Sequence, residues 1–209
     1  MKVRAKYLGF AAMLPLMTLA VPAAADTHKA MAATTASSPQ VETRAAVAAT
    51  QSPITLAEVE AAQQAWGQAL VAISSEYDRN GHAAAKRLAE QVIDTAYAYN
   101  MGKVLFKPTL TVSPQTFRTD RAGALAYFVG GNSDFANDKG FALQSWREFH
   151  IENAGVLLNG NTATTMGNVT LTDARGNQTV VDKTWGFVRG PDGKLRIMLH
   201  HSSLPFQPS

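Results

Sequence analysis

The chain has 209 residues, contains no cysteine and carries 19 basic against 16 acidic residues. The lack of cysteine excludes thiolate metal sites, cysteine nucleophiles and disulfides, so the fold depends on its hydrophobic core. Lys2, Arg4 and Lys6 account for the whole basic excess, because without residues 1–25 the formal count is 16 against 16. Neither nucleic acid nor an anionic membrane is therefore an expected partner.

Residues 1–25 have the pattern of a secretory signal peptide. The basic residues precede an apolar run from Tyr7 to Val21, and Ala23-Ala24-Ala25 supplies small residues for a signal peptidase. The run of about 15 residues is shorter than the roughly 20 that a membrane-spanning helix needs, and Pro15 interrupts it. We expect cleavage before Asp26, a periplasmic or secreted protein, and no membrane association after cleavage; a retained membrane anchor is the alternative.

Residues 26–54 are rich in Ala, Thr and Ser and have no hydrophobic period, which predicts a flexible tether. The remaining segment, 55–209, has the size of one ordinary domain. Its first part is predicted to be helical, since Thr55 and Glu58 have the spacing of a capping box. An apolar stripe at spacings of three and four follows, made of Val59, Ala62, Trp66, Leu70, Ile73 and Tyr77.

Asn80-Gly81 is expected to end the first helix, and a second helix is predicted from His82 to about Tyr97. Leu88, Val92 and Ala96 are expected on its buried face. The chain then becomes rich in β-formers, with 104–106 and 109–112 on either side of Pro108, a proline that favours an edge strand or a break. Residues 120–128 predict a short helix.

The last third of the chain predicts four strands, roughly 145–158, 162–172, 179–189 and 194–202, with Gly- and Asn-rich turns between them. The last three are expected to form a meander. Helices followed by a strongly curved antiparallel sheet are an α+β pattern in which the helices cover one face of the sheet.

Metal and nucleophile motifs are not evident in the sequence. Of five histidines, only His200 and His201 are neighbours, and successive strand residues point to opposite faces, so they are poorly placed to chelate one ion. Convergence of distant ligands in the fold remains the alternative. No phosphate-binding glycine loop, dinucleotide fingerprint or serine elbow occurs.

The final strand changes character at its end, where Leu195–Leu199 is followed by His200-His201-Ser202-Ser203. Such a polar end is typical of a strand that reaches water or a pocket. Pattern alone favours a solvated strand end with ordinary hydrogen bonds, and a functional site is the sharper alternative.

Five stretches of the domain resemble the signature of the iota-class carbonic anhydrases, in the order of that family. They are VLFKPT (104–109), GALAYFVG (123–130), Gly140-Phe141-Ala142 with Trp146, Met166-Gly167-Asn168, and LHHSS (199–203) with Pro205. The resemblance covers nearly the whole domain. One departure is that Phe206 and Gln207 follow Pro205, where many members carry an acid.

The resemblance implies an NTF2-like cone, similar to the association domain of calmodulin-dependent kinase II and commonly dimeric, so a homodimer is expected. It implies an enzyme that interconverts carbon dioxide and bicarbonate. Some members work without a metal and others are described as metal-dependent; we expect no cofactor, with a divalent ion such as Mn or Zn as the alternative. Thr109, Tyr127 and one His and one Ser of the LHHSS stretch are implied to line the site.

Strand parity decides which histidine and serine point inward. If Leu195, Ile197 and Leu199 face the interior, His201 and Ser203 share that face. We therefore expect the catalytic set Thr109, Tyr127, His201 and Ser203, while a bulge or a one-residue slip would select His200 and Ser202 instead. Hydroxyls of this set would orient water and donate to the bicarbonate oxygens, and the histidine would take or pass the proton.

Two other functions compete with this hypothesis. A non-catalytic assembly or small-ligand-binding module is possible on the same fold, because fold does not fix function. An isomerase of the ketosteroid type would need a carboxylate base inside the pocket. The acids near the expected pocket, Asp134, Asp138, Glu148 and Asp182, are not obviously inward.

Overall fold

The structure, a computed structural model, describes residues 52–208. The predicted leader (1–25) and most of the predicted tether (26–54) therefore lie outside the described residues. The order of the elements is α1 (Leu56–Ala96), β1 (Leu105–Lys107), α2 (Arg121–Val129), β2 (Trp146–Asn159), β3 (Thr162–Asp173), β4 (Gln178–Arg189) and β5 (Leu195–Ser203), with three short 3-10 turns at Ala98–Asn100, Ser133–Phe135 and Phe141–Leu143.

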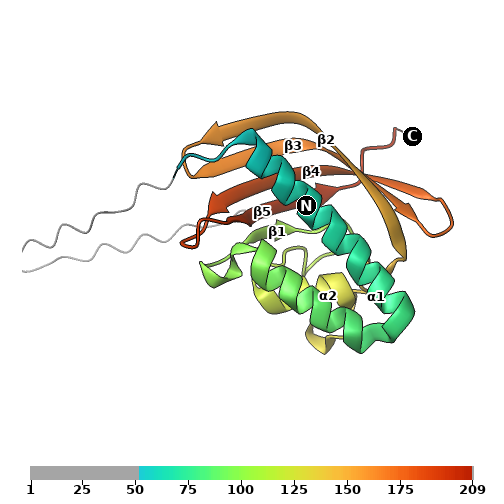
Figure 1. The fold of residues 1–209 in the computed structure, drawn as a ribbon. Coiled ribbons are helices and arrows are strands. Elements are labelled where there is room, and N and C mark those ends of the chain that lie inside the picture. Colours follow the sequence, from blue (N-terminus) through green and yellow to red (C-terminus); the bar gives the residue numbers. More distant parts are fainter. Residues whose placement is uncertain (1–51, 209) are drawn as a thin grey trace, which may run out of the picture. The chain divides into compact units, whose positions relative to one another are not determined.

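Helix α1 begins where the capping box predicts. The Thr55 side chain accepts from the Glu58 backbone N–H, and the Glu58 side chain accepts from the Thr55 N–H. Gly81 breaks the helical conformation with φ 77° and ψ −176°, a region that glycine enters without steric cost. The two predicted helices are thus the two arms of one kinked element, and Figure 1 shows the second arm folding back beside the first.

The five strands form one curved sheet in the order β1-β5-β4-β3-β2. Strands β2 to β5 pair with their sequence neighbours in antiparallel fashion, as predicted, and their bounds lie close to those expected. Strand β1 adds a parallel edge beside β5, which makes the sheet mixed. The stretch 109–112 forms no strand, because the chain turns away after Pro108.

The α+β architecture with helices on one face of the curved sheet is confirmed, as Figure 1 shows. Gly67 of α1 sits directly on the Phe149 ring of β2, so an added Cβ would overlap that ring. Most of the predicted stripe of the first arm is buried, whereas Tyr77 is 36% exposed. On the second arm, Ala85, Ala89 and Ile93 are the most buried, and the predicted Leu88, Val92 and Ala96 flank them half-buried.

Strand β5 carries one extra residue relative to β4. Gly186 is paired with Leu199 and Phe187 with Ile197, so Met198 has no counterpart on β4. Such a bulge reverses the alternation of side chains beyond it.

Among the described residues, no helix combines the length and the apolar character that crossing a bilayer requires.

Candidate active site

The bulge determines which polar residues of β5 face the core. His200 and Ser202 are 2% and 1% exposed, whereas His201 is exposed and Ser203 is half-buried. The expectation that His201 and Ser203 share the inner face is therefore wrong, because it assumed unbroken alternation after Ile197. His201 instead lines an apolar pocket of about 340 Å³ at the β1 edge, beside Leu105 and Phe117.

Thr109 and Tyr127 are brought together. Thr109 lies two residues beyond the end of β1, and Tyr127 points from α2 toward the 109–110 backbone and the Thr109 side chain. Burial raises the pKa of Tyr127, while these neighbours act in the opposite direction. The Tyr127 hydroxyl nevertheless makes no hydrogen bond of good geometry. It borders a pocket of about 220 Å³ that is also lined by Asp138 and Gly140.

Lys183 is a buried charge-bearing residue that the sequence analysis missed. It is 4% exposed on β4 and lies directly opposite Ser202 of β5. Its Nζ is 2.9 Å from Nε2 of His200. A signal for it exists in the sequence, since Val181, Lys183 and Trp185 alternate along one strand and share its inner face.

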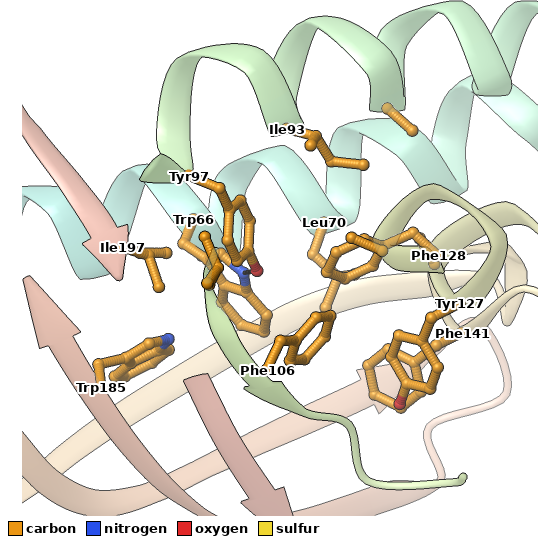
Figure 2. Packing of buried hydrophobic residues seen from close by; sticks show 14 of the residues in the cluster. Trp66, Leu70, Ile93, Tyr97, Phe106, Tyr127, Phe128, Phe141, Trp185 and Ile197 are labelled. Carbon is orange, nitrogen blue, oxygen red and sulfur yellow. Dashed lines mark hydrogen bonds between the residues drawn. The ribbon is translucent and has the colours of Figure 1, made fainter. Parts of the chain in front are cut away.

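A buried chain of hydrogen bonds connects α1 with the sheet. The Trp66 indole donates to the Tyr97 hydroxyl over 3.0 Å, and that hydroxyl lies 2.8 Å from Nδ1 of His200. Lys183 completes the chain at Nε2. The Trp66 and Tyr97 side chains meet in Figure 2, where Phe106 lies between them and Tyr127.

Burial controls the electrostatics of this chain. It lowers the pKa of Lys183 from its ordinary 10.5 to about 7, and no nearby carboxylate counters the shift. The ammonium position faces the indole rings of Trp66 and Trp185, with centroids at 4.6 Å and 5.5 Å. Burial is the main reason that the pKa of His200 lies well below its ordinary range, and the charges of Lys183 and His201 lower it further. These lowered pKa values favour the neutral forms of the His200 imidazole and the Lys183 amine in the core.

Three buried donors on the elements around this chain make no hydrogen bond of good geometry within residues 52–208. They are the hydroxyls of Tyr127 and Ser202 and the indole N–H of Trp185. An unpaired buried polar group costs on the order of 1–3 kcal/mol, so each of the three is a position where water or another polar ligand would be stabilising. Hydroxyl and N–H donors suit oxygen atoms that carry negative charge.

The acids considered for an isomerase do not supply a free base. Asp134, Glu148 and Asp182 are exposed, and Asp138 is buried but held by Arg118 through two hydrogen bonds of 2.9 and 2.8 Å. Within residues 52–208, no three His, Cys, Asp or Glu side chains gather as a metal site would require.

Comparisons with known proteins match the chain to a family. A family model described as metal-independent carbonic anhydrase matches residues 57–204. A metal-independent carbonic anhydrase of Nostoc sp. (strain PCC 7120) is 64% identical over 154 residues, covering 74% of this chain and 75% of that protein.

Two solved structures are also similar to this chain. The crystal structure of a cyanobacterial iota-carbonic anhydrase complexed with bicarbonate is 63% identical, covers 75% of this chain and 95% of its own, and superposes with a TM-score of 0.74. A candidate calcium/calmodulin-dependent protein kinase II association domain from Xanthomonas campestris is 23% identical, with 76% and 97% of the two chains covered and a TM-score of 0.48.

Proposed function

Since the chain belongs to the metal-independent carbonic anhydrase family, we propose that it interconverts carbon dioxide and bicarbonate at the buried hydroxyls of Tyr127 and Ser202. The observation that carries this placement is that each of these two hydroxyls is buried and lacks a hydrogen-bond partner among residues 52–208. Bicarbonate is also the ligand of the solved cyanobacterial relative. The family agrees with the expectation that no metal is required.

Hydration of carbon dioxide forms one bond from the water oxygen to carbon and breaks one O–H bond of the water. Negative charge then grows on the oxygens of the product, and donors already fixed in a dry site stabilise it most. Tyr127 and Ser202 supply such donors without reorganisation, since neither hydroxyl makes a hydrogen bond of good geometry in the described part of the chain. Thr109, beside the Tyr127 hydroxyl, orients the attacking water in this proposal.

In this proposal His200 and Ser202, the inner pair of β5, take the place of His201 and Ser203, the outer pair. His200 and Ser202 are buried, with Ser202 directly opposite Lys183, whereas His201 faces outward. Ser203 is the next residue of β5 and lies opposite Asp182 on β4, whereas Ser202 lies opposite Lys183. The two adjacent serines therefore provide a test variant and a matched control.

The experiment is stopped-flow carbon dioxide hydration after exhaustive chelation, with Ser202→Ala compared with Ser203→Ala. We expect chelation to leave activity intact and Ser202→Ala to lower kcat by about 100- to 1,000-fold, the range for loss of one oxyanion donor. Ser203→Ala is expected to stay within about twofold of the wild type, because the half-buried Ser203 side chain lies on the outer face of β5 and not beside Lys183. The reverse order would refute the inner-pair assignment, and a chain inactive under every condition would be a binding module.

Export and dimerisation are further proposals that rest on the sequence. The pattern of residues 1–25 supports cleavage before Asp26 and delivery to the periplasm or the medium. N-terminal sequencing of the protein recovered from the periplasmic fraction tests export, and full-length protein found only in the cytoplasm would refute it. Light scattering of the mature chain tests the homodimer, and a monomer mass at micromolar concentration would count against it.

A further inference from the structure

We propose that Lys183 and His200 act as one proton-accepting unit, in which the charge of the amine and the tautomer of the imidazole change together. The unit would hold the proton that leaves water during hydration and return it during dehydration. This inference rests on the proposed function, because it assigns the proton of that same reaction. It stands on two hydrogen bonds, Tyr97 Oη to Nδ1 at 2.8 Å and Lys183 Nζ to Nε2 at 2.9 Å.

The first step is the hydrogen-bond inventory of a neutral imidazole, which has one donor and one acceptor nitrogen. An ammonium only donates, so with charged Lys183 the Nε2 atom must accept and Nδ1–H must donate to Tyr97. A neutral amine can also accept, through its lone pair, so Nε2–H can then donate to Lys183 while Nδ1 accepts from the Tyr97 hydroxyl. The charged lysine therefore requires the Nδ1–H tautomer of His200. The neutral lysine permits the Nε2–H tautomer, which gives the Tyr97 hydroxyl proton an acceptor.

Tyr97 is compatible with both states. Its oxygen accepts the Trp66 indole N–H over 3.0 Å and has a second lone pair for Nδ1–H. In the charged state the phenolic proton itself has no acceptor in the hydrogen-bond network of residues 52–208, which adds to the cost of charging Lys183. The neutral state satisfies Trp66, Tyr97 and His200 together.

The surroundings allow the amine to change its charge near neutral pH. No salt bridge or hydrogen bond joins Lys183 to a carboxylate in the described part of the chain. Burial brings the pKa of Lys183 to about 7. The faces of the Trp66 and Trp185 indoles partly stabilise the charged ammonium by cation–π interaction, so the charged form can still be populated. The titratable groups next to the pair are Tyr97 at Nδ1 of His200, the neighbouring His201 of β5, and Lys107 of β1, whose Nζ donates to the Ser202 carbonyl.

The protons balance across the reaction. The neutral unit carries two protons on Nζ and one on Nε2, and the charged unit carries three on Nζ and one on Nδ1. The difference is the single proton released when water adds to carbon dioxide. His200 alone is a poor acceptor, because both of its nitrogens already have partners and burial disfavours the imidazolium. The charge therefore settles on Lys183.

The direct test is ¹⁵N NMR of the mature chain with labelled histidine and lysine, titrated from about pH 5.5 to 9, around the lysine pKa of about 7. We expect His200 to remain neutral and to exchange its tautomer at the same pH at which the Lys183 Nζ signal changes. Lys183→Met is expected to fix His200 in one tautomer over this range. Exposed His201 serves as an internal spectral control.

Any of three NMR outcomes would overturn the inference: one tautomer at every pH, formation of the imidazolium, or an exchange that persists in Lys183→Met. If that variant does not fold, the wild-type coincidence of the two signals decides alone. Activity separates the two proposals. Lys183→Met is expected to lose about 100-fold in kcat, within the range for a general base, together with the pH dependence centred on the NMR midpoint. A normal rate in this variant would refute the proton role and leave the carbonic anhydrase function standing.

Discussion

Phe106 stacks on the imidazole of His200, with their ring centroids 4.4 Å apart and their planes 21° from parallel. The contact follows from register, because these two residues are partners across the parallel pair of β1 and β5. Trp66 meets the same imidazole edge-on, at 5.6 Å, and Tyr97 stacks on it at 6.0 Å. The three-residue edge strand thus closes the aromatic enclosure that keeps the histidine neutral.

Phe106→Ala is expected to lower the free energy of unfolding by about 3–5 kcal/mol, as deletion of a buried aromatic ring does. It also admits water to His200, so the pKa of that imidazole should rise toward its ordinary range. Urea unfolding and ¹⁵N titration measure the two effects. Phe117→Ala is the control, since that ring is 65% exposed. Equal losses in the two variants would show that β1 does not seal the site.

Tyr97→Phe removes the hydroxyl that serves both the Trp66 indole and Nδ1 of His200. Two buried polar atoms lose their partner, so we expect a loss of about 1–3 kcal/mol in chemical denaturation. Tyr77→Phe provides the comparison, because Tyr77 of α1 is 36% exposed. A Tyr97→Phe protein as stable as the wild type would mean that this hydrogen-bonded chain contributes nothing to folding.

The stability of the protein should increase with pH between about 7 and 10.5. The folded-state pKa of Lys183 is about 7 and its ordinary value is 10.5, so the unfolded chain binds more protons in this window. Burial of neutral His200 acts in the same direction below pH 6.5. Lys183→Met should flatten the upper part of the profile by a few kcal/mol, on the order of 1.4 per pKa unit. Parallel profiles in urea titrations would contradict the assignment.

Asp138→Ala is expected to cost about 3–5 kcal/mol, because it leaves the Arg118 guanidinium buried without its counter-charge. Both side chains of this pair are 2% exposed. Asp78→Ala, which breaks the exposed pair with Arg147, should cost less than about 1 kcal/mol. Thermal or urea unfolding ranks the two variants. Similar losses would indicate that burial does not distinguish these pairs.

Gly67→Ala is expected to destabilise the fold by about 1–3 kcal/mol through overpacking, since the new Cβ would overlap the Phe149 ring. Gly155→Ala is the matched control on the facing strand, because a Cβ added there would meet no atom within 4 Å. Urea midpoints of the two variants measure the difference. A neutral Gly67→Ala would show that Phe149 moves aside freely.

The helices and the four long strands can be predicted from the sequence, because they depend on local patterns. Thr109 and Tyr127 are implied only by the family resemblance, and the structure places them side by side. The inner histidine and serine are predicted wrongly, since the bulge at Met198 depends on pairing with β4 and leaves no mark in an otherwise apolar run. Lys183 is overlooked although its alternation with Val181 and Trp185 indicates burial. Because lysine is seldom buried, a lysine at an inward position of a strand is a sign of a functional residue.

The first described residues are fixed at one end of the sheet. Ile54 donates its N–H to Gly160 in the β2–β3 turn over 2.7 Å, and Arg189 at the end of β4 binds Glu58 and the Pro53 carbonyl. Ser202 lies toward the opposite end, because Ser203 pairs with Asp182 while Leu195 pairs with Arg189. An affinity tag or a linker for immobilisation on a support is therefore better attached before residue 52. A segment fused after β5 would begin only a few residues from Ser202 and so close to the proposed site.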